Sequence, residues 1–166
     1  MNIQNYGKIF ESDFKNSISD DCWIYRLRDN ASSFANGNNT RFTSSNICDF
    51  ILFDDHTKML FLLECKSTKS TSVPLKMIRE TQIKGLLEAG KHNLTAGFII
   101  NFRNKNNDTF FISISQFKEM LDTLNKKSFN IEDLKNANAI CVLSNKKRTR
   151  YTYDIKKFIE EVIPND

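Results

Sequence analysis

Residues 62–68 read LLECKST, an apolar run that ends with a glutamate and a lysine two positions apart, Glu64 and Lys66. The longer segment 58–67, KMLFLLECKS, is typical of a buried β-strand because apolar residues fall on both of its faces. Side chains alternate along a strand, so Glu64 and Lys66 share one face. Charges in such a place cost several kcal/mol each unless they are paired or bind a metal. We therefore expect a functional site on this strand.

The preceding segment 47–54, ICDFILFD, predicts a second buried strand. The residues DDHT that follow predict a turn, so the two strands form a hairpin. With residues 55–56 at the tip, residues whose numbers sum to 111 face each other, and Asp49 lies opposite Leu62. Asp49 then shares a face with the two charged residues of the next strand. The hairpin is expected to bring two carboxylates and one ammonium together at one end of a buried sheet.

Two interpretations of this charge cluster are open. In the first, Asp49 and Lys66 form a structural ion pair and Glu64 leans toward solvent. In the second, the two carboxylates hold a metal ion, because close carboxylates raise each other's pKa unless a cation lies between them. Hard oxygen ligands without histidine favour Mg²⁺ or Mn²⁺. The cation would polarise a phosphodiester and bind the attacking water, and Lys66 would position or deprotonate that water or offset charge in the transition state.

The rest of the chain alternates helical and extended patterns. We predict a polar loop over 28–46, helices over 6–18, 75–89, 115–125 and 155–162, and further strands over 22–27, 94–102, 109–114, 139–143 and 149–153. Pro74 and Gly90 are expected to bound the second helix, and Ser115 and Asp154 to cap the last two. The last two strands are expected to pair with each other. The order predicts an α/β fold with a mixed sheet between helices.

Two polar residues lie beside apolar helical stripes. Gln82 falls in the middle of the stripe formed by the second helix, and a buried amide needs a partner. That partner is either the backbone or the carboxylate site. Glu11 borders the apolar side of the first helix, where it is either solvated surface or a metal ligand or water-orienting group.

Composition limits the class of protein. The 166 residues suit one domain, and 40% hydrophobic residues with 14 Phe indicate a globular chain. The sequence has no apolar run of membrane-spanning length and no apolar signal core in MNIQNYGK, which predicts a cytoplasmic protein without a membrane partner. Four dispersed cysteines predict reduced thiols and no structural zinc site. The net charge of +4 is concentrated in 66–91 and in KKRTR at 146–150, which favours a polyanionic partner.

The pattern of Asp49 followed by Glu64-Cys65-Lys66 resembles the D…(D/E)xK signature of the PD-(D/E)xK nuclease superfamily. More narrowly, the sequence resembles the RecU family of Holliday junction resolvases in the motifs GKIFE at 7–11, CDF at 48–50, LECKST at 63–68, VPLKMI at 73–78, TQIKGL at 81–86 and the following AGFIINFR. The resemblance implies a restriction-endonuclease-like mixed β-sheet core flanked by helices. We expect a single nuclease domain over 1–166, with a core over about 6–117 and a C-terminal strand pair and helix over 138–163.

By this resemblance, Asp49 and Glu64 are metal ligands together with the backbone carbonyl of Cys65, and Lys66 is the catalytic lysine. Glu11 and Gln82 are accessory active-site residues. The family cuts four-way DNA junctions as a homodimer with Mg²⁺. Two departures stand out. Ile47 and Cys48 occupy the place of the superfamily's usual proline before the aspartate, and only about residues 29–45 fill the place of the family's protruding stalk.

The basic residues around the cluster are candidate DNA contacts: Arg26, Arg28 and Arg41 at the polar loop, and Lys69, Lys76 and Arg79 after the central strand. Phe34 in the loop is a candidate for stacking on unpaired bases. The sequence predicts a Mg²⁺- or Mn²⁺-dependent DNA endonuclease of bacterial or phage origin that resolves Holliday junctions as a homodimer. The alternatives are a nuclease of the same fold acting on other DNA, of restriction or branch-trimming type, or a DNA-binding module without catalysis.

Overall fold

The computed structural model describes residues 5–27 and 46–163. Its centre is a six-stranded sheet with the order β1-β2-β3-β5-β6-β8, in which β3 and β5 are parallel and all other neighbours are antiparallel. These strands are β1 (Cys22–Arg26), β2 (Phe50–Asp54), β3 (Leu60–Thr68), β5 (Thr95–Phe102), β6 (Thr109–Ser113) and β8 (Ile140–Cys141). The predicted fold class, a mixed sheet flanked by helices, is confirmed.

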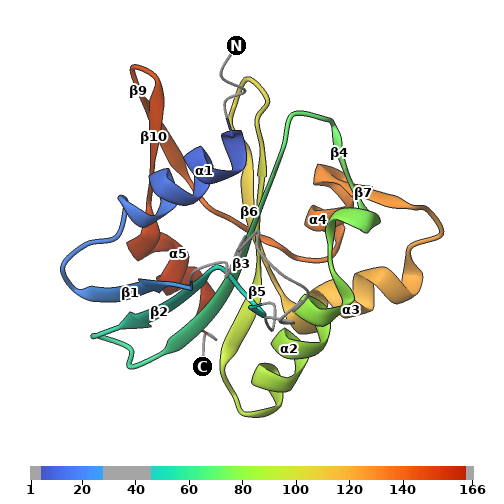
Figure 1. The fold of residues 1–166 in the computed structure, drawn as a ribbon, viewed down its shortest axis with the longest axis horizontal. Helices are drawn as coiled ribbons and strands as arrows, with labels where there is room; N and C mark the ends of the chain where they lie inside the picture. Colours follow the sequence, from blue (N-terminus) through green and yellow to red (C-terminus); the bar gives the residue numbers. More distant parts are fainter. Residues whose placement is uncertain (1–4, 28–45, 164–166) are drawn as a thin grey trace, which may run out of the picture.

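Helices cover both faces of this sheet (Figure 1). One apolar cluster joins the sheet to α1 (Tyr6–Lys15) and α5 (Ile155–Val162). A second cluster on the other face joins it to α2 (Glu80–Lys91), α3 (Ile114–Thr123) and α4 (Ile131–Asn136). Within the described part of the chain, none of these helices is long and apolar enough to cross a bilayer.

Two small antiparallel sheets complete the fold. The first pairs β4 (Ser72–Pro74) with β7 (Ser128–Asn130), and the second pairs β9 (Ser144–Lys147) with β10 (Arg150–Tyr153). The pairing that we predicted between 139–143 and 149–153 is therefore wrong. The short strand β8 pairs with β6 instead, and β10 takes its nearest neighbour along the chain as partner. A tight turn with Arg148 in the left-handed region (φ 44°) makes this local pairing possible.

The β2–β3 hairpin differs from the predicted register by two residues. Phe50 pairs with Leu63, so facing residues sum to 113 and not to 111. The connection is longer than predicted because the Asp54 carboxylate accepts hydrogen bonds from both the amide and the hydroxyl of Thr57, at 2.7 and 2.6 Å. An even slip leaves every side chain on its predicted face. Asp49 follows the last pair of this register, Phe50 with Leu63, and its amide donates to Leu63 O at 3.0 Å.

The second helix begins later than predicted. Residues Leu75–Met77 form a separate 3₁₀ turn, η1, and α2 begins only at Glu80. The break arises because Ile78 and Arg79 are extended, with ψ angles of 116° and 138°. Gly90 lies inside α2 and does not end it.

Of the two helix caps predicted for the C-terminal half, the first is wrong and the second is confirmed. The cap of α3 is Ser113 and not Ser115. The predicted cap of α5 is confirmed, since Asp154 accepts a hydrogen bond from the Lys157 amide at 3.0 Å.

Helix α2 packs closely against the segment that leads into Asp49. A Cβ atom added to Gly85 would lie 2.2 Å from Cγ2 and 2.6 Å from Cβ of Ile47, closer than carbon atoms can approach. Gly85 therefore allows the helix to approach this segment, two residues before the predicted site begins.

We expect Gly85→Ala to destabilise the protein by about 1–3 kcal/mol, the usual cost of overpacking a core. The matched control is Gly90→Ala in the same helix, where the added Cβ meets Ile114 at an ordinary 3.5 Å. The control should be neutral or stabilising by up to about 1 kcal/mol, because alanine favours helix. Urea denaturation measures both, and Ile47→Ala should recover part of the loss in the Gly85→Ala background. Equal effects of the two glycine changes would contradict this account.

Candidate active site

Asp49 lies immediately before β2 and is held by three backbone hydrogen bonds. Its Oδ2 accepts from the Cys65 amide at 2.8 Å, its own amide donates to Leu63 O at 3.0 Å, and its carbonyl accepts from the Leu27 amide at 2.8 Å. Asp49 is half-buried, and its position is set by β1 on one side and β3 on the other.

Glu64 is the most deeply buried carboxylate of the cluster, with 3% of its surface exposed. Its Oε1 accepts from Lys66 Nζ at 2.6 Å and from Gln82 Nε2 at 2.5 Å. The structural alternative in which Lys66 pairs with Asp49 and Glu64 faces solvent is therefore wrong. Of the two interpretations of Gln82, the structure contains both, because its Oε1 accepts from the Arg79 amide at 3.2 Å while its amide nitrogen binds Glu64.

Both carboxyl groups of this cluster titrate above their ordinary range. Burial raises the pKa of Asp49 to about 7, and the negative charge of Glu64 adds to the effect. Burial also raises the pKa of Glu64, against the opposing charge and hydrogen bond of Lys66, the charge of Arg79 and the hydrogen bond of Gln82. The donors around Glu64 stabilise its anion, whereas Asp49 has one amide donor and a carboxylate neighbour. A bound cation would stabilise both anions.

The oxygens of Asp49 and Glu64 fit a hard divalent cation. In the described parts of the chain, Asp49 Oδ1 and Glu64 Oε2 accept no hydrogen bond, so each residue retains one free ligand oxygen. No group of three or more His, Cys, Asp or Glu side chains in 5–27 and 46–163 is arranged to hold a metal. Two carboxylates still suit Mg²⁺, which is commonly bound by one or two carboxylates and keeps several waters.

Glu11 approaches the cluster from α1, where its charge contributes to the raised pKa of Asp49. Its Oε2 accepts from Arg26 Nη2 at 2.5 Å and from Arg26 Nε at 3.0 Å, and the side chain is 18% exposed. Glu11 is thus not simple solvated surface. Arg26, predicted as a DNA contact, places its guanidinium on this carboxylate.

The remaining predicted DNA contacts divide into two groups. Lys69, Lys76 and Arg79 are exposed, and Arg79 lies close enough to Glu64 for its charge to lower the pKa of that carboxyl group. Its influence on the site was not foreseen from the sequence, because the predicted helix placed Arg79 within a helical turn and not at its cap. The other group, Arg28, Phe34 and Arg41, lies outside the described residues.

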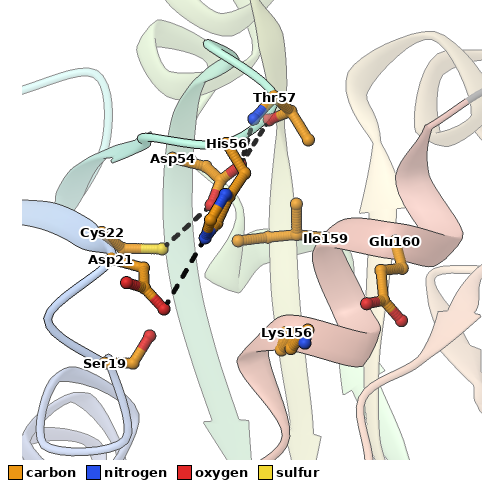
Figure 2. A pocket seen from close by; sticks show the side chains of 9 residues that line it. All are labelled: Ser19, Asp21, Cys22, Asp54, His56, Thr57, Lys156, Ile159 and Glu160. Carbon is orange, nitrogen blue, oxygen red and sulfur yellow. Dashed lines mark hydrogen bonds and ion pairs between the residues drawn. The ribbon is translucent and has the colours of Figure 1, made fainter.

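A separate pocket of about 300 Å³ lies between the β2–β3 turn and α5 (Figure 2). Its reactive groups already serve the local structure. Cys22 Sγ donates to Asp54 at 3.3 Å, and burial raises the pKa of this thiol to about 11, which makes it a poor nucleophile near neutral pH. His56 lies 3.8 Å from Asp21 and is 75% exposed. The pocket does not rival the carboxylate cluster as a reactive centre.

Asp49 immediately before β2, with Glu64 and Lys66 on the neighbouring strand β3, forms the D…ExK arrangement on a mixed α/β sheet. The family model described as RecU, Recombination protein U, matches residues 24–157. The SPbeta prophage-derived uncharacterized protein YotM of Bacillus subtilis (strain 168) is 33% identical over 188 aligned positions, which cover 100% of this chain and 91% of that protein. The chain belongs to the RecU family.

One solved structure in this comparison is the Archaeoglobus fulgidus protein Hjc, described as a Holliday junction resolvase from an archaeal hyperthermophile. It is 12% identical, with a TM-score of 0.44, over 73% of this chain and 83% of its own.

The raised pKa of Asp49 predicts how stability depends on pH. The native carboxyl group keeps its proton up to about pH 7, whereas the ordinary value is 3.8, so the folded state binds more protons between these values. Stability of the metal-free protein should therefore fall as pH rises through this window. Asp49→Asn, which keeps an acceptor for the Cys65 amide, should remove this loss, and its Tm should exceed that of the wild type increasingly toward high pH.

Thermal unfolding in EDTA across this pH range measures the effect, with the exposed Asp20→Asn as control. Added Mg²⁺ should raise the wild-type Tm at high pH but not that of Asp49→Asn, because binding to the native state alone stabilises it. Parallel Tm–pH curves for the wild type and Asp49→Asn, or an equal Mg²⁺ effect on both, would contradict the assignment.

Proposed function

We propose that this RecU-family chain is a Mg²⁺- or Mn²⁺-dependent DNA endonuclease that resolves four-way junctions in DNA recombination and repair. The observation that carries the proposal is the fixed Glu64 carboxylate, which Lys66 and Gln82 hold near enough to Asp49 for the two charges to interact. The prophage origin of the Bacillus subtilis relative supports a bacterial or phage protein that acts in the cytoplasm.

Each residue of the cluster has a distinct part in this chemistry. Asp49 Oδ1, Glu64 Oε2 and the backbone carbonyl of Cys65 would hold the cation, which supplies polarisation of the phosphodiester and a more acidic water. Gln82 and Lys66 both bind Glu64 Oε1, so they fix the carboxylate and leave its other oxygen free to hold a cation. Lys66, with 13% of its side chain exposed, would position the attacking water or offset charge in the transition state. Glu11 would orient water from the α1 side.

A homodimer is part of the proposal, because a two-fold symmetric enzyme can cut both strands of a symmetric junction. Trp23 and Tyr25 on the edge strand β1 are 54% and 49% exposed, and their rings stack with centroids 6.0 Å apart. Exposed aromatic side chains of this kind are enriched at protein interfaces. Size-exclusion chromatography with light scattering tests the dimer, and a monomer at micromolar concentration would contradict it.

Cleavage assays on four-way junction, flap, single-stranded and linear duplex DNA test the reaction itself. With Mg²⁺ or Mn²⁺ we expect preferential cutting of the junction, and Asp49→Asn should abolish cutting while the fold is retained, because the metal site loses a ligand. Full activity in EDTA would rule out the metal mechanism. Preference for linear duplex would favour the restriction-type alternative, and binding without cutting would favour the DNA-binding module.

Lys66 and Lys69 provide a matched pair of lysines three residues apart, one in the cluster and one exposed. Lys66→Ala should lower the single-turnover rate by at least about a hundredfold, the size expected when one preorganised charge is removed. Its DNA affinity should change little, because one contact among many carries a small share of binding. Lys69→Ala should leave the rate at saturating protein unchanged and should weaken DNA binding only slightly, because it also removes a single contact. If Lys66→Ala reduced rate and affinity in proportion, Lys66 would be a phosphate anchor and not a catalytic group.

A further inference from the structure

A groove of about 570 Å³ lies between α1, the β9–β10 hairpin and the end of β5. Figure 1 shows the β9–β10 hairpin beside α1, at the end of the sheet where β3 ends. Three cations line the groove: Lys69 after β3, Arg103 after β5, and Arg150 on β10. The basic run KKRTR, singled out in the sequence, thus lies at a site to which two other segments also bring positive charge.

The walls of this groove are fixed by specific contacts. Asp13 on α1, 5% exposed, accepts from Arg150 Nε at 2.5 Å and from the Tyr151 amide at 3.2 Å. Ser17 accepts from the Tyr153 amide at 2.9 Å, so both ends of β10 are tied to the segment of α1. Among the described residues that line the groove, Asp13 is the one acidic residue, and Arg150 already neutralises it. The hairpin is therefore held in place, and the remaining cations of the groove keep their charge.

Arg103 is positioned for a ligand that its protein neighbours do not supply. Its backbone amide donates to Thr68 O at 2.8 Å, and its guanidinium lies 4.5 Å from the centre of the Tyr6 ring. Its Nε is a buried nitrogen without a hydrogen-bond partner in the described structure. Neither Arg103 nor Lys69 has a carboxylate partner among residues 5–27 and 46–163. Unsatisfied buried donors are costly, which favours an anionic oxygen here.

The positive charge continues along the hairpin. Lys146, Lys147 and Arg148 are exposed and form no ion pair with the described residues. A band of cations therefore extends from Lys69 to the tip of the hairpin. Repulsion within such a band gives no stability to the fold, whereas a polyanion would neutralise it.

The band begins close to the carboxylate cluster. Lys69 follows Lys66 by three residues, about 10 Å along an extended chain, which corresponds to about three nucleotides of one duplex strand. Glu64 faces α2, whereas the groove opens toward α1. A DNA strand that reaches from Glu64 to the groove therefore passes over the ends of β3 and β5. Building on the nuclease proposal, we propose that the groove binds the sugar–phosphate backbone of the DNA strand that leaves the cutting site, and that the β9–β10 hairpin holds its next phosphates.

Two groups of substitutions test this surface. The hairpin variant combines Lys146→Gln, Lys147→Gln and Arg148→Asn, in which asparagine tolerates the positive φ of the turn. The groove variant combines Lys69→Gln and Arg103→Gln. The control variant removes an equal number of positive charges, three, on the α3–α4 side of the molecule, through Lys118→Gln, Lys127→Gln and Lys135→Gln. Thermal unfolding establishes that each variant is folded.

Binding to junction and duplex DNA is measured in EDTA over a range of salt concentrations. Each lost phosphate contact flattens the plot of log K against log salt by close to one unit, so the hairpin variant should lose about two to three units and the groove variant about one to two. The control should keep the wild-type slope. Single-turnover cleavage at sub-saturating protein should slow in the hairpin and groove variants, because less DNA is bound, and should keep its wild-type rate in the control variant.

The outcomes separate this inference from the nuclease proposal. A wild-type slope in the hairpin and groove variants of an enzyme that cuts DNA would overturn the groove and leave the nuclease intact. A flattened slope in a protein that cuts no DNA with any metal would support the groove and overturn the nuclease. Equal flattening in the control would show a general charge effect and overturn the groove.

Discussion

The hydrogen bond from the Cys65 amide to the Asp49 carboxylate is the contact on which the site depends. It ties Asp49 to β3 just beyond Phe50 and Leu63, the last pair of the β2–β3 register, and so holds Asp49 close enough for the charge of Glu64 to act on it. The same strand directs Cys65 into the α1 side of the core and Glu64 toward α2. Strand alternation therefore separates the apolar support from the charged face, and one backbone amide brings the second carboxylate to that face.

The two carboxylates of the cluster are stabilised to different degrees by their surroundings. Glu64 has two strong donors, whereas Asp49 has one amide and a carboxylate neighbour, which raises its pKa. Gln82 links this balance to the fold, because one side chain both caps α2 and holds Glu64. The break before Glu80 follows from this double role: a helix continuing from Leu75 would leave the Arg79 amide bonded within the helix and Gln82 without its capping partner.

Sequence reasoning predicted the face of each charged residue but not the exact partners. The predicted face of Asp49 is correct although the hairpin register was wrong by two residues, because an even slip preserves the face. The turn length was not predicted, because the contacts of Asp54 with Thr57 that lengthen the turn leave no periodic pattern in the sequence. The inward orientation of Gln82 was predicted correctly, because its angular position relative to Leu86 and Ala89 does not depend on where the helix begins. Strand β9 was missed because its sequence, SNKK, has no apolar alternation. It pairs with β10 across a tight turn at Arg148, and contacts of β10 with Asp13 and Ser17 hold the hairpin in place.

No proline precedes Asp49 directly, and the packing of Ile47 shows how this chain positions that aspartate. A proline would restrict the backbone through its own ring. Here Ile47 lies against the bare backbone of Gly85, and the Asp49 carbonyl and amide bond to Leu27 and Leu63. Side-chain packing and two strand-like hydrogen bonds thus restrict the segment that a ring would otherwise stiffen. The consequence is a coupling between α2 and Asp49. The helix that supplies Gln82 to Glu64 also supports the segment that carries Asp49, so a change in the packing of this helix should move both carboxylates together.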